Sequence, residues 1–179
     1  MTAQRQERNS GRVTKRHRLR PVAIALWAGL GGVAVAAQGC LAVASQAATT
    51  ERVVVNRYTG LAIDGFDPVA YFVDGRPVIG QEDFEASEAG AVWRFHNEGN
   101  RASFVAHPEV YAPMFGGYDP TGVARSVTLA GNPRFWLILG QRLYLFDRAE
   151  TRDAFAGDAP RLLREAVARW PELKQDLAE

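Results

Sequence analysis

Cysteine is nearly absent from this chain: Cys40 is the only cysteine among 179 residues. The segment after residue 47 therefore has no thiol. It can form no disulfide, no thiolate metal site and no cysteine-based redox couple. The stability of that segment must come from packing alone.

The chain also lacks a basic stripe after its first twenty residues. Of its 21 Lys and Arg residues, seven lie in residues 1–20, where only Glu7 opposes them. The rest of the chain then holds 14 basic and 19 acidic residues. A net negative body lacks the electrostatic footprint that a phosphate backbone requires, so we expect no nucleic-acid partner.

Sequence motifs that are typical of common catalytic sites are absent as well. There is no Gly-x-Ser-x-Gly turn, no phosphate-binding Gly-Lys-Ser/Thr, no His-Glu-x-x-His pair and no dinucleotide fingerprint. The sequence therefore predicts that the protein is not an enzyme, and an enzyme of unrecognised type is the least favoured reading.

What is present at the N-terminus is the pattern of an export signal. Five basic residues between Arg12 and Arg20 precede an uncharged stretch whose most apolar part runs from Val22 to Ala37. Small residues follow at Ser45 and Ala47, where a signal peptidase reads them. The positive end stays in the cytoplasm while the apolar run enters the bilayer. We expect residues 1–47 to place the body in the periplasm or on the extracytoplasmic face of an inner membrane.

Three fates of this leader remain open. It is a cleaved signal peptide, an uncleaved membrane anchor if the apolar run is read through to Ala44, or a lipidation signal at Cys40. In the last two cases the membrane is a partner through the N-terminal segment. No other partner and no oligomeric state is indicated.

The remaining residues predict one small α+β domain. We expect a linker over residues 48–57, a domain over 58–174 and a short tail over 175–179. No repeat of 20 to 50 residues is evident, which favours a single domain. A hydrophobic content of 47% is typical of a globular chain.

Turn and capping signals predict the elements of this domain. Two β-hairpins are expected, with strands over 84–87 and 91–96 around Glu88-Ala89-Gly90 and over 135–139 and 143–146 around Gly140. Helices are expected at a short segment begun by Asp67-Pro68, from Asn97 through Ala106, and over 149–155 and 160–170 with Pro171 near the end of the packing.

These residues resemble the exported YHS-domain proteins over about residues 58 to 174. The resemblance is carried by a set of motifs in order: Gly65-Phe66-Asp67-Pro68-Val69-Ala70-Tyr71-Phe72, Gly90 with Trp93-Arg94-Phe95, Asn100 and Phe104, His107 through Pro113, Phe115-Gly116-Gly117-Tyr118, Arg142 through Leu145, and Trp170-Pro171-Glu172-Leu173. It implies a small α+β module. Some YHS modules bind metal ions, and exported members commonly carry Cys or selenocysteine directly after Gly-Gly-Tyr. Here Asp119 stands at that place.

The resemblance and the donor types together suggest a binding module without its sulfur ligand. A loop of Gly116, Gly117, Tyr118 and Asp119 is the candidate ligand-binding segment, because glycines allow close approach of a partner. His96, His107 and Asp119 are candidate ligands for a divalent transition metal ion, since imidazole and carboxylate suit such ions without sulfur.

Each of these residues also has an ordinary structural role to consider. His96 ends a strand, His107 can satisfy a helix carbonyl, and Asp119-Pro120 is a common turn pair. A protein-interaction module without a ligand is the alternative function.

Overall fold

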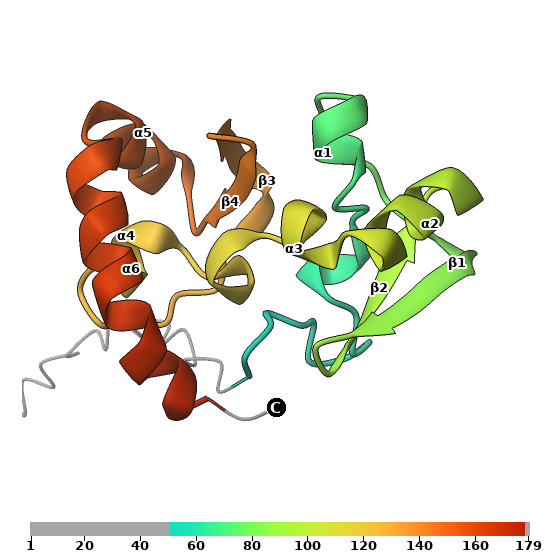
Figure 1. Ribbon diagram of the computed structural model, residues 1–179, viewed down its shortest axis with the longest axis horizontal. Helices are drawn as coiled ribbons and strands as arrows, with labels where there is room; N and C mark the ends of the chain where they lie inside the picture. Colours follow the sequence, from blue (N-terminus) through green and yellow to red (C-terminus); the bar gives the residue numbers. More distant parts are fainter. Residues whose placement is uncertain (1–50, 178–179) are drawn as a thin grey trace, which may run out of the picture. The chain divides into compact units, whose positions relative to one another are not determined.

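The computed structural model describes residues 51–177. The leader expected over residues 1–47, with Cys40, lies outside the described residues. Among residues 51–177 no helix combines the length and apolarity needed to cross a membrane. The elements, drawn in Figure 1, are η1 (Ile63–Gly65), α1 (Ala70–Val73), β1 (Gln81–Glu88), β2 (Ala91–Phe95), α2 (Glu98–Ala106), α3 (Pro108–Tyr111), η2 (Met114–Gly117), α4 (Pro120–Val123), β3 (Asn132–Leu139), β4 (Arg142–Phe146), α5 (Ala149–Gly157) and α6 (Ala159–Gln175).

The fold class is α+β. Two antiparallel two-stranded sheets, β1–β2 and β3–β4, are accompanied by helices that follow each hairpin (Figure 1). Both predicted hairpins are confirmed, and so are the helix that Asn97 caps and the helices after Asp147. Asp67 begins the short helix α1, because its Oδ1 accepts the N–H groups of Val69 and Ala70 at 2.8 and 3.3 Å.

The described residues contain a structural repeat whose halves are offset by about 51 residues, just outside the range of 20 to 50 residues in which the sequence shows no repeat. A 3₁₀ turn, a four-residue helix, a hairpin and a nine-residue helix occur in the same order at residues 63–106 and 114–157. The strands have equal lengths in the two repeats, eight and five residues. Each long strand also carries one irregularity, between Gln81 and Glu85 and between Asn132 and Trp136, 51 residues apart.

Equivalent residues make equivalent backbone contacts in the two repeats. The N–H of Asp67 donates to Val78 and that of Asp119 donates to Leu129, at 2.8 and 2.9 Å. Gly80 donates to Gly65 just as Gly131 donates to Gly117, both at 2.9 Å. Gly80 and Gly131 each lie so close to the second strand of their own hairpin that a Cβ would come within 2.6 Å of it. In both repeats the segment before the hairpin is therefore held against the second strand by equivalent backbone contacts.

The aromatic packing repeats too. Phe104 of α2 lies 5.0 Å from Trp93 and 5.1 Å from Phe95, measured between ring centroids. In the second repeat Phe155 of α5 packs against Tyr144 and Phe146 at 5.4 and 5.3 Å. In both repeats, one buried phenylalanine of the helix thus packs against two alternate residues of the second strand and holds the helix against its own hairpin.

Strand β4 lies between two hydrophobic clusters. Leu143 and Leu145 pack with the first repeat, whereas Tyr144 and Phe146 pack with α5 and α6. Side chains alternate between the two faces of a strand, and here both faces are buried. This explains why β4 is continuously apolar or aromatic from Leu143 to Phe146.

The segments before and after the repeats belong to the packed unit. Val53 and Val54, placed in the expected linker, are buried in different clusters, and the Val54 N–H donates to the Gly116 carbonyl at 2.8 Å. Helix α6 continues through Pro171 to Gln175, beyond its expected end, and Leu177 after it is buried. Residues of the expected linker and tail therefore contribute to the packed core.

A substitution at Gly116 can test the close approach of residues 52–54 to η2. A Cβ on Gly116 would overlap the carbonyl oxygen of Arg52, and φ is +64°. We expect Gly116→Ala to lower the free energy of unfolding by about 2–5 kcal/mol, from the left-handed backbone and the overlap together. Chemical denaturation of the full chain measures this.

Gly140 provides the matched control. Its φ is +58° and nothing lies within 4 Å of a Cβ built there. Gly140→Ala should therefore cost only the backbone term, about 1–2 kcal/mol. Equal losses for the two variants would contradict the close contact between residues 52 and 116.

A substitution at Tyr71 can test the contact between the two repeats. Its hydroxyl donates to the Pro133 carbonyl at 2.8 Å, and burial, then the charges of Asp67 and Asp64, raise the pKa of Tyr71. The unfolded state ionises first, so the stabilisation is complete below pH of about 10 and is lost as the pH rises toward the folded pKa. Above pH 10 the free energy of unfolding should therefore decrease as the pH rises. We expect Tyr71→Phe to make this decrease less steep, by up to about 1.4 kcal/mol per pH unit. An unchanged slope would contradict this.

Candidate functional site

Asp119, the residue directly after Gly116-Gly117-Tyr118, is fully buried and serves as a helix cap. Its Oδ1 accepts the Thr121 N–H at 2.7 Å at the start of α4, and its Oδ2 accepts the Asp147 N–H at 2.9 Å just after β4. Both carboxylate oxygens therefore have backbone donors. The expectation that Asp119 is a metal ligand is replaced by a structural role, because neither oxygen faces an open site.

Tyr118 and Gly117, predicted as ligand-binding residues, also make internal contacts. The buried Tyr118 hydroxyl donates to the Glu51 carbonyl. Gly117 is buried, has φ of +90°, and accepts the Gly131 N–H through its carbonyl. The close approach that the two glycines allow is to the chain's own backbone. Of the four predicted loop residues, only Gly116 lines a cavity.

His96 belongs to a polar cluster around buried Asp67. Asp67 Oδ2 accepts the His96 N–H at 2.9 Å and the Asn100 amide at 2.7 Å, and lies 2.8 Å from His96 Nδ1. The Asn97 amide nitrogen lies 2.7 Å from His96 Nε2. The Asn100 amide nitrogen lies 3.1 Å from His96 Nδ1, so both ring nitrogens have polar neighbours within the protein. In the second repeat Asp147 stands at the place of His96.

His107 lies apart from this cluster. It is exposed at the junction of α2 and α3, with Nδ1 3.4 Å from the Glu109 carboxylate. Within residues 51–177 no group of three or more His, Asp and Glu side chains is arranged to hold a metal ion. The structure thus does not bring His96, His107 and Asp119 together.

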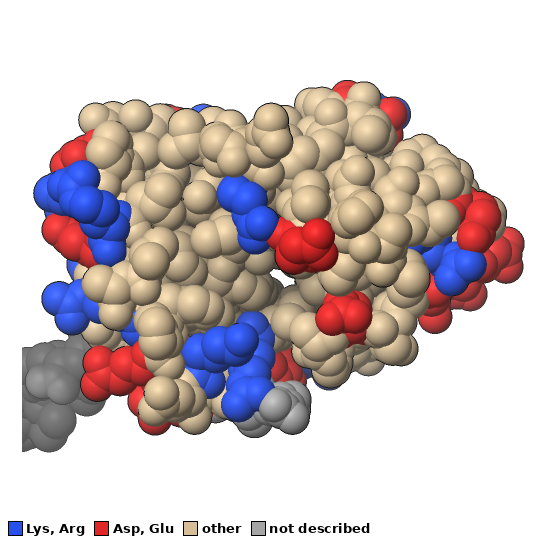
Figure 2. Space-filling view, in the orientation of Figure 1, with Lys and Arg blue, Asp and Glu red and all other residues tan. Residues whose placement is uncertain are grey.

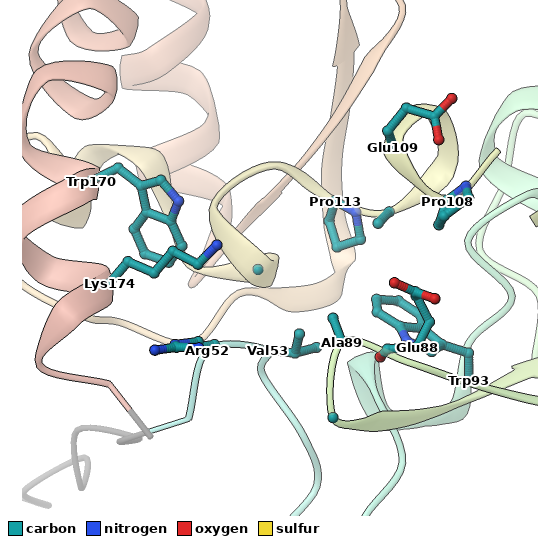
Figure 3. Close-up of a pocket in the computed structure, with 13 residues that line it drawn as sticks. Arg52, Val53, Glu88, Ala89, Trp93, Pro108, Glu109, Pro113, Trp170 and Lys174 are labelled. Atoms are coloured by element: carbon teal, nitrogen blue, oxygen red, sulfur yellow. Dashed lines mark hydrogen bonds between the residues drawn. The ribbon is translucent and has the colours of Figure 1, made fainter. Parts of the chain in front are cut away.

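A cavity of about 590 Å³ opens beside Gly116. Figure 3 shows that its lining comes from the turn between β1 and β2, from α3, from the segment at Arg52 and from α6. The lining residues are Arg52, Val53, Glu88, Ala89, Gly90, Trp93, Pro108, Glu109, Ala112, Pro113, Gly116, Trp170 and Lys174. Segments more than 100 residues apart in the chain, such as Arg52 and Trp170, therefore form one site.

Two indole rings border the cavity: Trp93, which is only 1% exposed and lies beneath its lining, and the partly exposed Trp170. Trp93 packs against Phe104, and its Nε1–H donates to the Glu88 carbonyl at 3.0 Å. Trp170 contacts Phe115 edge-on, with ring centroids 5.7 Å apart, and lies 6.1 Å from Tyr118. Each ring is held by the protein core, so this border exists without a ligand.

Apart from Gly116, the residues of this cavity were missed by sequence reasoning. Trp93 and Trp170 were expected to be core residues, which they also are, and the charged Arg52, Glu88 and Lys174 carried no motif. The left-handed φ of +52° at Ala89 became visible only in the structure, and Gln141 in the turn of the other hairpin shares it at +58°.

No protein-family model, no curated protein and no solved structure matches this chain. What the cavity accepts is therefore argued from its own residues.

Asp119 and Asp67 should prove equally important for stability. We expect Asp119→Asn and Asp67→Asn each to lower the free energy of unfolding by about 1–3 kcal/mol, since an amide nitrogen then faces a backbone donor. Asp83→Asn, at an exposed position of β1, should change it by less than about 0.5 kcal/mol. Denaturation curves of the full chain give all three values.

A titration of the same variants with Zn(II) and Cu(II) separates the structural from the metal-binding role of Asp119. We expect the two ions to shift the thermal midpoint of Asp119→Asn as much as that of the unchanged chain. An ion that stabilises the unchanged chain and fails to stabilise Asp119→Asn would contradict the structural role.

Proposed function

We propose that this protein is an exported, non-catalytic binding module of the YHS-like type, and that it holds a small organic ligand in the cavity beside Gly116. The single observation that carries the proposal is this cavity, which is bordered by the indole rings of Trp93 from β2 and Trp170 from α6. Cavities that hold small molecules span about 300–1,000 Å³ and combine aromatic surface with a few polar groups. The cavity beside Gly116 has a volume in this range and combines aromatic with polar lining residues.

The cavity is a consequence of the way the repeats are joined. It lies where the β1–β2 turn of the first repeat meets η2 of the second, with α3 between them in sequence and α6 added after them. The equivalent turn of the second hairpin, at Gly140 and Gln141, does not line it. A feature built from unrelated segments of the chain favours a site over a chance gap between symmetric halves.

An organic ligand fits the lining better than a metal ion. The described residues offer no cluster of imidazole and carboxylate donors, whereas the cavity offers Trp93, Trp170, Val53, Pro108 and Pro113. Apolar and aromatic surface of this kind binds carbon frameworks through the hydrophobic effect. The divalent metal ion of the first expectation is therefore not part of the proposal.

The place of action follows from the leader. The basic residues before Val22–Ala37 favour export, and the body after residue 47 contains no thiol that an oxidising compartment would alter. We place the binding module in the periplasm or on the extracytoplasmic face of the inner membrane. In the second case the N-terminal segment keeps it at the membrane.

Blocking the cavity tests the proposal. The full chain is screened by thermal unfolding and tryptophan fluorescence against amino acids, short peptides, amines, carboxylic acids and aromatic alcohols. A ligand at about 100 times its Kd should add about 2.7 kcal/mol of stability. We expect Ala89→Trp, which places an indole at the cavity mouth, to abolish that gain.

Gln141→Trp is the control for this variant. Gln141 is exposed in the turn of the other hairpin and has a similar left-handed φ of +58°, yet it does not line the cavity. It should leave the stabilisation unchanged. The proposal fails if no compound stabilises the chain at millimolar concentration, or if the gain persists in Ala89→Trp.

A further inference from the structure

The charges around the cavity are separated by sign. Arg52 and Lys174 line one side, and Glu88 and Glu109 line the other. Figure 3 shows the Lys174 side chain extending alongside Trp170 and the Glu88 carboxylate beside Trp93, with Val53 and Pro113 between them. Figure 2 shows a hollow on the face that it draws, with basic and acidic side chains around it.

Two of these charges have no counterpart among the residues that the structure describes. Among residues 51–177, the side chains of Lys174 and Glu88 take part in no ion pair or hydrogen bond, although basic residues elsewhere are paired, such as Arg94 with Glu85 at 2.7 Å and Arg161 with Asp158 at 2.5 Å. Lys174 and Glu88 do not pair with each other either, because the cavity lies between them. Each of these two charged groups can therefore pair with a group of opposite charge on a ligand in the cavity.

The surface between the charged sides is apolar. Val53, Ala112 and Pro113 line it together with the indoles of Trp93 and Trp170. A ligand that lies across this surface would place one end near an ammonium group and the other near a carboxylate, while its middle loses contact with water. Opposite charges at the ends and an apolar middle are the complement of this arrangement.

We propose that the ligand is a zwitterion whose charges are separated by an apolar segment, with its anionic end at Lys174 and its cationic end at Glu88. Short peptides and ω-amino acids both have this chemistry. An α-amino acid has it less well, because its amine and carboxylate are attached to one carbon. This inference rests on the proposed function, since it names the class of molecule that the same cavity holds.

Ligands that differ by one charge test the inference with the full chain. The first arm compares 6-aminohexanoate with hexanoate and hexylamine. The second compares the tripeptide Ala-Phe-Ala with its N-acetylated and C-amidated forms. In at least one arm we expect the zwitterion to bind about tenfold more tightly than either partner that lacks one charge, because a charge-assisted contact is worth about 1.5–3 kcal/mol. Preference between the arms identifies the peptide or the ω-amino acid.

Charge reversal assigns each end of the ligand to a side of the cavity. Lys174→Glu should abolish the preference for a free carboxylate and keep that for a free amine, and Glu88→Lys should do the opposite. Arg164→Glu on α6 and Asp83→Lys on β1 are exposed changes of the same kind outside the cavity, and should alter neither preference. Circular dichroism checks that all four variants are folded.

The possible outcomes separate this inference from the proposed function. If hexanoate, hexylamine and 6-aminohexanoate bind equally well and Ala89→Trp blocks all three, the cavity is a binding site but its ligand is not a zwitterion. The inference is also overturned if Lys174→Glu or Glu88→Lys leaves both preferences intact. If none of the probes binds and the broader screen also finds no ligand, both proposals fail.

Discussion

Two buried carboxylates, Asp67 and Asp119, organise the fold. Each accepts backbone N–H groups from the start of a short helix with one oxygen, and from the residue after a strand with the other. A buried carboxylate is costly unless its charge is met by hydrogen bonds, and backbone donors meet it here in both repeats. The hairpin and the preceding turn of each repeat are thereby fixed to one another, and the cavity depends on both repeats being so fixed.

The pairing of these two residues changes the meaning of Asp119. The sequence alone, through its resemblance to YHS-domain proteins, suggested that Asp119 stands in place of a sulfur ligand. Compared with Asp67 in the other half of the same chain, it is the second of two equivalent caps. The first repeat adds the His96 side chain to its carboxylate, whereas the second has Asp147 there, which contributes only its backbone N–H. The repeats thus share their backbone contacts and differ in their side chains.

The cavity shows where that difference has an effect. Its lining takes a turn from the first hairpin but none from the second, and it adds Arg52, Trp170 and Lys174 from segments outside the repeats. These flanking segments are held by the core: Val53 and Val54 pack on opposite sides of it, and Trp170 packs against Phe115. Residues outside the repeats thereby make an asymmetric site on a nearly symmetric framework.

The sequence by itself determined what depends on neighbouring residues. Alternating apolar side chains and the turns at Ala89 and Gly140 predicted the hairpins, caps such as Asn97 predicted helix starts, and together they predicted the α+β class. Tertiary structure decided what depends on residues distant in the chain: the repeat, the partners of Asp119 and the cavity. The repeat was hidden because its halves agree mainly in Gly-aromatic-Asp-Pro and a few phenylalanines, and backbone contacts can be preserved while most side chains change. The cavity was hidden because Trp93 and Trp170 have the same pattern as core residues, and only folding brings their rings to opposite sides of one space.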